Sequence, residues 1–129
     1  MIQARMGSSR FPGKALRPIL GTEAIGWIAR RLQQSHSIDE TVLATADTGE
    51  NAVLCQWAAI HGLRWIVGPE QDVLSRIRLA AQHTDADAVV RVTGDCVLID
   101  PQLVDQVVDL WRREPRLDYT STVMPRLFP

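Results

Sequence analysis

Short apolar runs rich in β-branched residues alternate along this chain with longer segments in which apolar residues recur every three or four positions. The short runs, at residues 1–5, 41–45, 63–67, 88–92 and 119–122, are expected to be strands, and most of the segments between them helices. Strands and helices in this order form βαβ units. The sequence therefore predicts an α/β fold, a three-layer, Rossmann-like, mainly parallel sheet with helices on both faces.

Right-handed crossovers bring the carboxyl ends of parallel strands to one edge of the sheet. The loops that leave those ends are residues 7–14, 46–47, 68–69 and 93–100, the most polar and glycine-rich segments of the chain. In open α/β sheets ligands bind at this edge, so the sequence predicts a site there. The expected helix N-caps are Thr22, then Asp47 or Thr48, and later Asp100.

Size and composition limit the classes of protein to consider. A chain of 129 residues, 46% of them hydrophobic, is long enough for one domain with its own core. No apolar run reaches the roughly 18 residues of a membrane span, and no leader opens the chain. A net charge of −1 argues against nucleic acid as a partner, and two cysteines without metal-ligand spacing favour a reduced, cytoplasmic protein.

Basic residues are concentrated at the start of the chain. No acid precedes Glu23, whereas Arg5, Arg10, Lys14 and Arg17 all fall in that stretch. Such a positive local field in a nearly neutral chain indicates a small polyanion as the ligand.

The segment GSSRFPGK, residues 7–14, follows the first predicted strand. Its spacing is not that of a Walker A loop, because five residues separate Gly7 from Gly13 and Ala15 stands where Ser or Thr would hold magnesium. We expect a phosphate-binding loop of another kind; the alternative is a solvated basic loop. The residues that suit phosphate are a glycine, two serine donors and two cations: Gly7, Ser8, Ser9, Arg10 and Lys14.

The second motif is RVTGDCVLIDP, residues 91–101. Thr93, Gly94 and Asp95 follow a strand of alanine and valine, and the glycine permits a sharp exit that carries the carboxylate over the edge of the sheet. One carboxylate plus phosphate oxygens is a common way to hold Mg²⁺, so Asp95 is the candidate metal ligand. The alternative is an Asp in a turn. Asp100, before Pro101, is assigned to a helix cap.

Other reactive side chains have structural explanations. Cys96 has no histidine near it in sequence and is expected to be a small buried residue. His61 and His83 lie near predicted helix C-termini, where an imidazolium complements the helix dipole. Asp72 and Arg76, four positions apart on a helix, are expected to form a surface ion pair.

Taken together, IQARMGSSRFPGKAL and VVRVTGDCVLIDP resemble the cytidylyltransferase family, and most closely its spore coat polysaccharide protein F branch, related to the CMP-Kdo and CMP-acylneuraminate synthetases. DETVLATAD and GPEQDVLSR resemble the same branch, and Val97 departs from a usual proline. The resemblance implies the fold of nucleotide-diphospho-sugar transferases, CTP as nucleotide and Mg²⁺ as cofactor. It also implies transfer of CMP to a sugar or sugar acid, with release of pyrophosphate, for surface polysaccharide biosynthesis, and dimers as the usual assembly.

The resemblance also assigns residues. Arg10, Lys14 and Asp95 take the catalytic roles, the two cations on the triphosphate and the carboxylate on the metal, which requires Lys14 and Asp95 to lie close enough to share one nucleotide. Asp47 and Arg76 are expected near the base and ribose. The full set of nucleotide-binding positions is Ala4, Arg5, Gly7, Ser8, Ser9, Arg10, Lys14, Asp47, Arg76, Thr93 and Gly94.

Members of this family are about double the length of this chain. Residues 1–129 are therefore expected to be the nucleotide-binding part of a domain that is incomplete at its C-terminus, without most of the sugar pocket and a further acidic metal ligand. Two alternatives are a catalytically incomplete nucleotide-binding or interaction module and a nucleotide-sugar pyrophosphorylase that uses another base.

Overall fold

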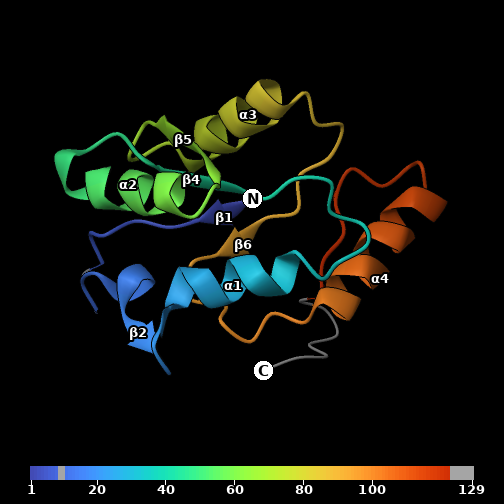
Figure 1. The fold of residues 1–129 in the computed structure, drawn as a ribbon. Coiled ribbons are helices and arrows are strands. Elements are labelled where there is room, and N and C mark those ends of the chain that lie inside the picture. Colours follow the sequence, from blue (N-terminus) through green and yellow to red (C-terminus); the bar gives the residue numbers. More distant parts are fainter. Residues whose placement is uncertain (9–10, 123–129) are drawn as a thin grey trace.

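The computed structural model of the chain describes residues 1–8 and 11–122. Its central sheet has the strand order β5-β4-β1-β6 (Figure 1). The strands are β1 (Ile2–Gln3), β4 (Val42–Ala46), β5 (Arg64–Gly68) and β6 (Val92–Thr93). β1 pairs with β4 and β6, β4 pairs with β5, and each pairing is parallel. The predicted α/β fold with a mainly parallel sheet is confirmed.

Helices cover both faces of the sheet (Figure 1). One face packs against α1 (Ala24–Leu32) and α2 (Ala52–Ile60) around Ile2 and Leu43, and α4 (Pro101–Arg113) adds Val104 to this core. The other face packs Val42 and Ala44 against α3 (Val73–Thr84). Successive residues of β4 thus point to opposite faces, which gives three layers. None of the helices in the described residues is long and apolar enough to cross a bilayer.

The helix ends agree in part with the expected caps. Asp100 accepts a hydrogen bond from the backbone of Gln102, which confirms the predicted cap of α4. Thr48 precedes a 3₁₀ turn, η2 (Gly49–Asn51), that leads into α2, and its side chain makes no capping bond. Thr22 was the wrong residue for the start of α1, because it lies in a short strand and the helix begins after Glu23.

A short antiparallel hairpin, β2 (Pro18–Ile19) and β3 (Thr22–Glu23), lies outside the central sheet and was not expected. Its two turn residues both have positive φ, 49° at Leu20 and 80° at Gly21, as the tightest hairpin turns require. Leucine rarely adopts this conformation, so the sequence carries no clear sign of the turn.

The fifth predicted strand, at residues 119–122, is wrong, since these residues form no strand. Thr120 instead donates a side-chain hydrogen bond to the Val107 carbonyl of α4, 3.4 Å away, and Tyr119 is 78% exposed. The β-like composition of this segment therefore finds no partner strand within the described part of the chain. The fourth strand was also expected too early, because its ladder contains only Val92 and Thr93.

Candidate functional site

The carboxyl ends of all four parallel strands lie along one edge of the sheet, as expected. Gln3 is in register with Ala44 of β4 and with Thr93 of β6, and Ala46 is in register with Gly68 of β5. The loops that follow these strands therefore start side by side.

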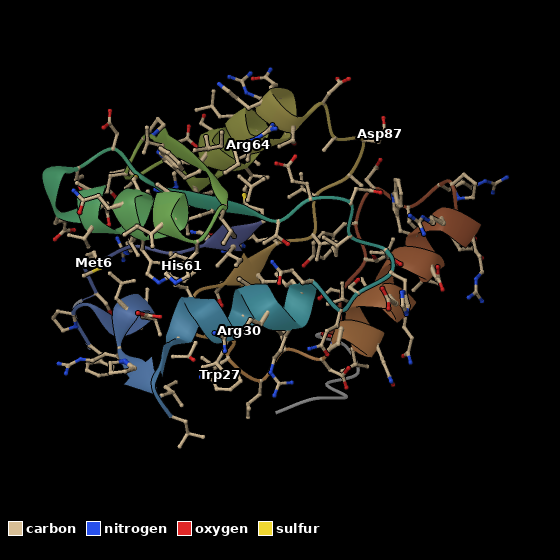
Figure 2. All side chains as sticks on the ribbon, in the orientation of Figure 1. Met6, Trp27, Arg30, His61, Arg64 and Asp87 are labelled. Carbon is tan, nitrogen blue, oxygen red and sulfur yellow. The ribbon has the colours of Figure 1, made fainter. Side chains whose placement is uncertain are left out.

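The basic loop, residues 7–14, follows β1 and is closed at its base by the Met6 carbonyl. This oxygen accepts hydrogen bonds from the backbone of Ser8, at 3.0 Å, and of Gly13, at 2.9 Å. Figure 2 shows Met6 where the chain leaves β1 for this loop. Gly13 has a φ of 70°, which favours glycine, and directly precedes the 3₁₀ turn η1 (Lys14–Leu16). The chain thus turns at Gly13 and returns toward the sheet at Lys14.

Lys14 and Asp95 meet, although 81 positions separate them in the sequence. The Lys14 Nζ lies 2.5 Å from Oδ2 of Asp95, and Thr93 donates its hydroxyl to Oδ1 at 2.7 Å. The hydrogen bond from Lys14, and after it the one from Thr93, hold the pKa of the Asp95 carboxyl below its ordinary value. The two side chains are 34% and 52% exposed, so a ligand can reach both. The expected proximity of Lys14 and Asp95 is confirmed.

Asp95 suits a magnesium ion that is shared with phosphate. Among the described residues no group of three or more His, Cys, Asp or Glu side chains could enclose a metal. Mg²⁺ however keeps several waters and is usually bound by one or two carboxylates together with substrate phosphates. A half-exposed carboxylate beside a hydroxyl and a lysine fits that mode of binding and does not fit a closed structural site.

Ala4 and Gly94 position this carboxylate by close packing. The Gly94 amide donates to the Gln3 carbonyl at 2.8 Å, and a Cβ at Gly94 would lie only 2.8 Å from the Cβ of Ala4. Any side chain at position 94 would therefore push the loop that carries Asp95 away from β1. Ala4 and Gly94 are both buried, so the structure shows them as packing residues.

Cys96, the next residue of this loop, is exposed, which corrects the expectation of a buried residue. It directly follows Asp95, and its Sγ is 3.1 Å from the Thr93 hydroxyl.

Arg76 is a buried cation near the end of β5. Only 3% of it is exposed, and its Nη1 donates to the carbonyls of Pro69 at 2.8 Å and Glu70 at 2.9 Å. Burial, and after it the charge of Arg5, lowers the pKa of the Arg76 guanidinium, so the two arginines lie within electrostatic reach. The surface ion pair expected between Asp72 and Arg76 is wrong. Asp72 instead caps α3 through the Ser75 amide. The carbonyls of the β5–α3 loop accept from Nη1 of the guanidinium, whereas its buried Nε has no hydrogen-bond partner among the described residues.

The remaining site candidates are distributed along the same edge. Asp47 is exposed after β4, and its amide donates to Gly68 at 2.8 Å. Ser8 uses its hydroxyl within the loop, accepting from the Phe11 amide at 3.3 Å. The backbone of Gly7 lies against the Glu50 side chain. Ser9 and Arg10 lie outside the described residues. Lys14, Thr93 and Asp95 thus lie together at the centre of the candidate site, and Asp47 and Arg76 follow the neighbouring strands β4 and β5.

Asn51 was not singled out in the sequence, yet it joins two of these loops. Its side chain is 1% exposed and bonds the Met6 amide, the Ala46 carbonyl and the Thr48 hydroxyl. An asparagine in a polar segment gives no sequence signal for such a role, because Met6 is 45 positions away.

Three comparisons relate the chain to known proteins. The profile of the family described as Cytidylyltransferase matches residues 1–126. The spore coat polysaccharide biosynthesis protein SpsF of Bacillus subtilis is 34% identical over 112 residues, which cover 84% of this chain and 47% of that protein. A cytidylyltransferase from Leptospira borgpetersenii has a similar structure, with a TM-score of 0.83 and 35% identity over 89% of this chain and 48% of that one.

The structure of CMP:2-keto-3-deoxy-manno-octonic acid synthetase, solved in complex with CTP, is also similar. Its TM-score is 0.78 at 29% identity, over 90% of this chain and 47% of that one. The chain thus spans about half the length of the relatives it matches.

Proposed function

Because the chain belongs to the cytidylyltransferase family, we propose that residues 1–129 form the CTP-binding part of a nucleotidyltransferase that transfers CMP to a sugar or sugar acid. The observation that carries the proposal is the contact between Lys14 and Asp95, 2.5 Å apart at the carboxyl edge of the sheet. A cation from the basic loop and a carboxylate from the β6 loop are there close enough to serve one triphosphate. The likeness to the Bacillus subtilis protein supports surface polysaccharide biosynthesis as the setting. We propose the cytoplasm as the compartment, because both cysteines are free thiols.

In the proposed reaction an acceptor hydroxyl attacks the α-phosphorus of CTP. The new bond joins the acceptor oxygen to phosphorus, the bond from the α-phosphorus to the bridging oxygen breaks, and pyrophosphate leaves with the electron pair. The acceptor proton passes to solvent. Little covalent chemistry falls to the protein, so its residues act by position and charge. Lys14 and Arg10 neutralise the departing pyrophosphate, Arg5 and Arg76 add positive potential, and Asp47 faces the ribose side.

Asp95 would hold the Mg²⁺ ion, with Thr93 fixing the orientation of the carboxylate. A bound Mg²⁺ supplies further neutralisation of the phosphate charges. For Asp95 to take that role, its contact with Lys14 must open, which leaves the ammonium group free for a phosphate oxygen.

Calorimetric titration tests the nucleotide. CTP with Mg²⁺ is expected to bind more tightly than UTP, GTP or ATP, and removal of Mg²⁺ with a chelator is expected to weaken CTP binding. Preference for another base would instead favour a nucleotide-sugar pyrophosphorylase. No binding of any nucleoside triphosphate would refute the proposal.

A second candidate function is favoured by the coverage of the relatives, about half of their length. Residues 1–129 by themselves would then bind CTP without completing the transfer. Pyrophosphate release with a panel of sugar acids separates the two: binding with release supports the transferase, and binding without release supports a nucleotide-binding module.

A further inference from the structure

We infer that Asn51 is a positioning residue whose buried amide fixes the start of the basic loop relative to the end of β4. The inference depends on the proposed function only for the identity of the ligand, CTP. Asn51 lies at the end of η2, between β4 and α2, and is one of the few buried polar residues among those that the structure describes, with 1% of its surface exposed.

The Asn51 amide makes three hydrogen bonds to two different loops. Its Oδ1 accepts from the Met6 amide at 2.8 Å. Its Nδ2 donates to the Ala46 carbonyl at 3.1 Å and to the Thr48 hydroxyl at 2.6 Å. The orientation of the amide is fixed by its partners, because a backbone N–H must meet the oxygen and a backbone carbonyl must meet the nitrogen. Neither an aliphatic side chain nor a carboxylate could satisfy both.

Met6 passes this restraint on to the basic loop. Its amide is held by Asn51, while its carbonyl accepts from Ser8 and from Gly13, the residue before Lys14. Met6 is therefore anchored on the β4 side through its amide and closes the basic loop through its carbonyl. The position of Lys14 over Asp95 depends on where that closure sits.

The same amide also holds the segment that contains Asp47. Ala46 and Thr48, the residues on either side of Asp47, are both partners of Asn51 Nδ2. Asn51 thus links the loop proposed to bind the triphosphate with the loop proposed to lie near the ribose. Holding both before the ligand arrives reduces the ordering that binding requires.

The test compares Asn51→Ala and Asn51→Asp with a matched control, Ser35→Ala. Ser35 is also a buried polar residue, 8% exposed, with a side-chain hydrogen bond to Asp105, but it lies beyond the C-terminal end of α1, away from the candidate site. Asn51→Ala is expected to weaken CTP binding roughly tenfold or more, because the partly buried Met6 amide loses its partner and the Ala46 carbonyl keeps only the Thr48 amide. Ser35→Ala is expected to lower the melting temperature while leaving CTP affinity within about twofold of the wild type.

Amide hydrogen exchange, measured without CTP, reports directly how well the amides of the basic loop are protected. Exchange at the Met6 and Gly13 amides is expected to be faster in Asn51→Ala than in Ser35→Ala. Asn51→Asp keeps an acceptor for Met6 and loses both donors, so its Met6 protection and its CTP affinity are expected to fall between those of Asn51→Ala and the wild type.

Two outcomes would overturn the inference: unchanged loop exchange and CTP affinity in Asn51→Ala, or an equal effect of Ser35→Ala on both. If Asn51→Ala does not fold, the test uses Asn51→Asp. The inference then requires that Asn51→Asp weaken CTP binding more than Ser35→Ala does, and an equal effect would overturn it. If the wild type does not bind CTP, the proposed function fails, and the exchange comparison still decides the role of Asn51.

Discussion

Replacing Lys14 by methionine should weaken the binding of CTP while changing the stability of the fold only slightly. The Lys14–Asp95 pair is 34% and 52% exposed, and ion pairs this accessible to water contribute only about 0–1 kcal/mol to folding. The melting temperature of Lys14→Met is therefore expected to fall by at most about 5 °C. A hydrogen bond from an ammonium to a phosphate is worth roughly 1.5–3 kcal/mol. Since about 1.4 kcal/mol corresponds to a factor of ten, CTP should bind roughly 10–150 times more weakly.

Arg64→Met is the matched control for this experiment. Arg64 forms a comparable surface pair with Glu40, with an Nε–Oε1 distance of 3.0 Å and side chains 51% and 40% exposed. It begins β5, at the end of the strand opposite to Gly68 and the candidate site (Figure 2). We expect a similarly small change in melting temperature and no change in CTP affinity. The variants are compared by thermal unfolding and by calorimetry with CTP and Mg²⁺. A Lys14→Met protein that binds CTP as tightly as Arg64→Met would refute the assignment of Lys14 to the triphosphate.

Three further predictions concern the described residues around this site and the core. Thr45→Val should raise the free energy of unfolding in urea by about 1 kcal/mol, because the buried Thr45 hydroxyl has no hydrogen-bond partner among the described residues; a loss of stability would contradict this. Gly13→Ala should cost about 1–2 kcal/mol in the same assay, since its φ is 70°, and a neutral result would show that the loop adapts. The pKa of Asp105 is lowered chiefly by the Ser35 hydroxyl, so its contribution to stability is present above the ordinary carboxyl pKa and is lost as the pH falls through the lowered value. Ser35→Ala should therefore make unfolding less dependent on pH in acid, and identical pH profiles would count against that contact.

The sheet could be predicted because its signals are local. Apolar runs such as residues 41–45, and the helical repeats that separate one such run from the next, can be recognised without knowing any distant contact. Their order along the chain then favours a parallel sheet. The segment at residues 119–122 has the same kind of local signal, but whether it pairs depends on a neighbouring strand. In the described residues its Thr120 bonds α4 instead. A β-like composition therefore predicts a strand correctly only where a neighbouring strand is available to pair with it.

The proximity of Lys14 and Asp95 could be predicted by the same kind of reasoning, whereas the contacts that support the two loops could not. Lys14 and Asp95 each follow a predicted parallel strand, so topology alone brings them to one edge. Asn51 and Arg76 act through backbone groups, at Met6 for the first and at Pro69 and Glu70 for the second. Contacts with backbone groups cannot be recognised from residue types, because every residue has a backbone carbonyl. For that reason the sequence predicted Asp72, and not the loop carbonyls, as the partner of Arg76.

The exposure of the Lys14–Asp95 pair also bears on how a ligand could enter. In the structure the Lys14 ammonium and the Asp95 carboxylate neutralise each other. A triphosphate with Mg²⁺ would offer both a better partner, an anion for Lys14 and a cation for Asp95. Because a half-exposed ion pair contributes so little to folding, opening it costs little, and most of the new interaction energy remains available for binding. The same pair buried in the core would oppose the exchange, since each charge would lose its partner without water to replace it.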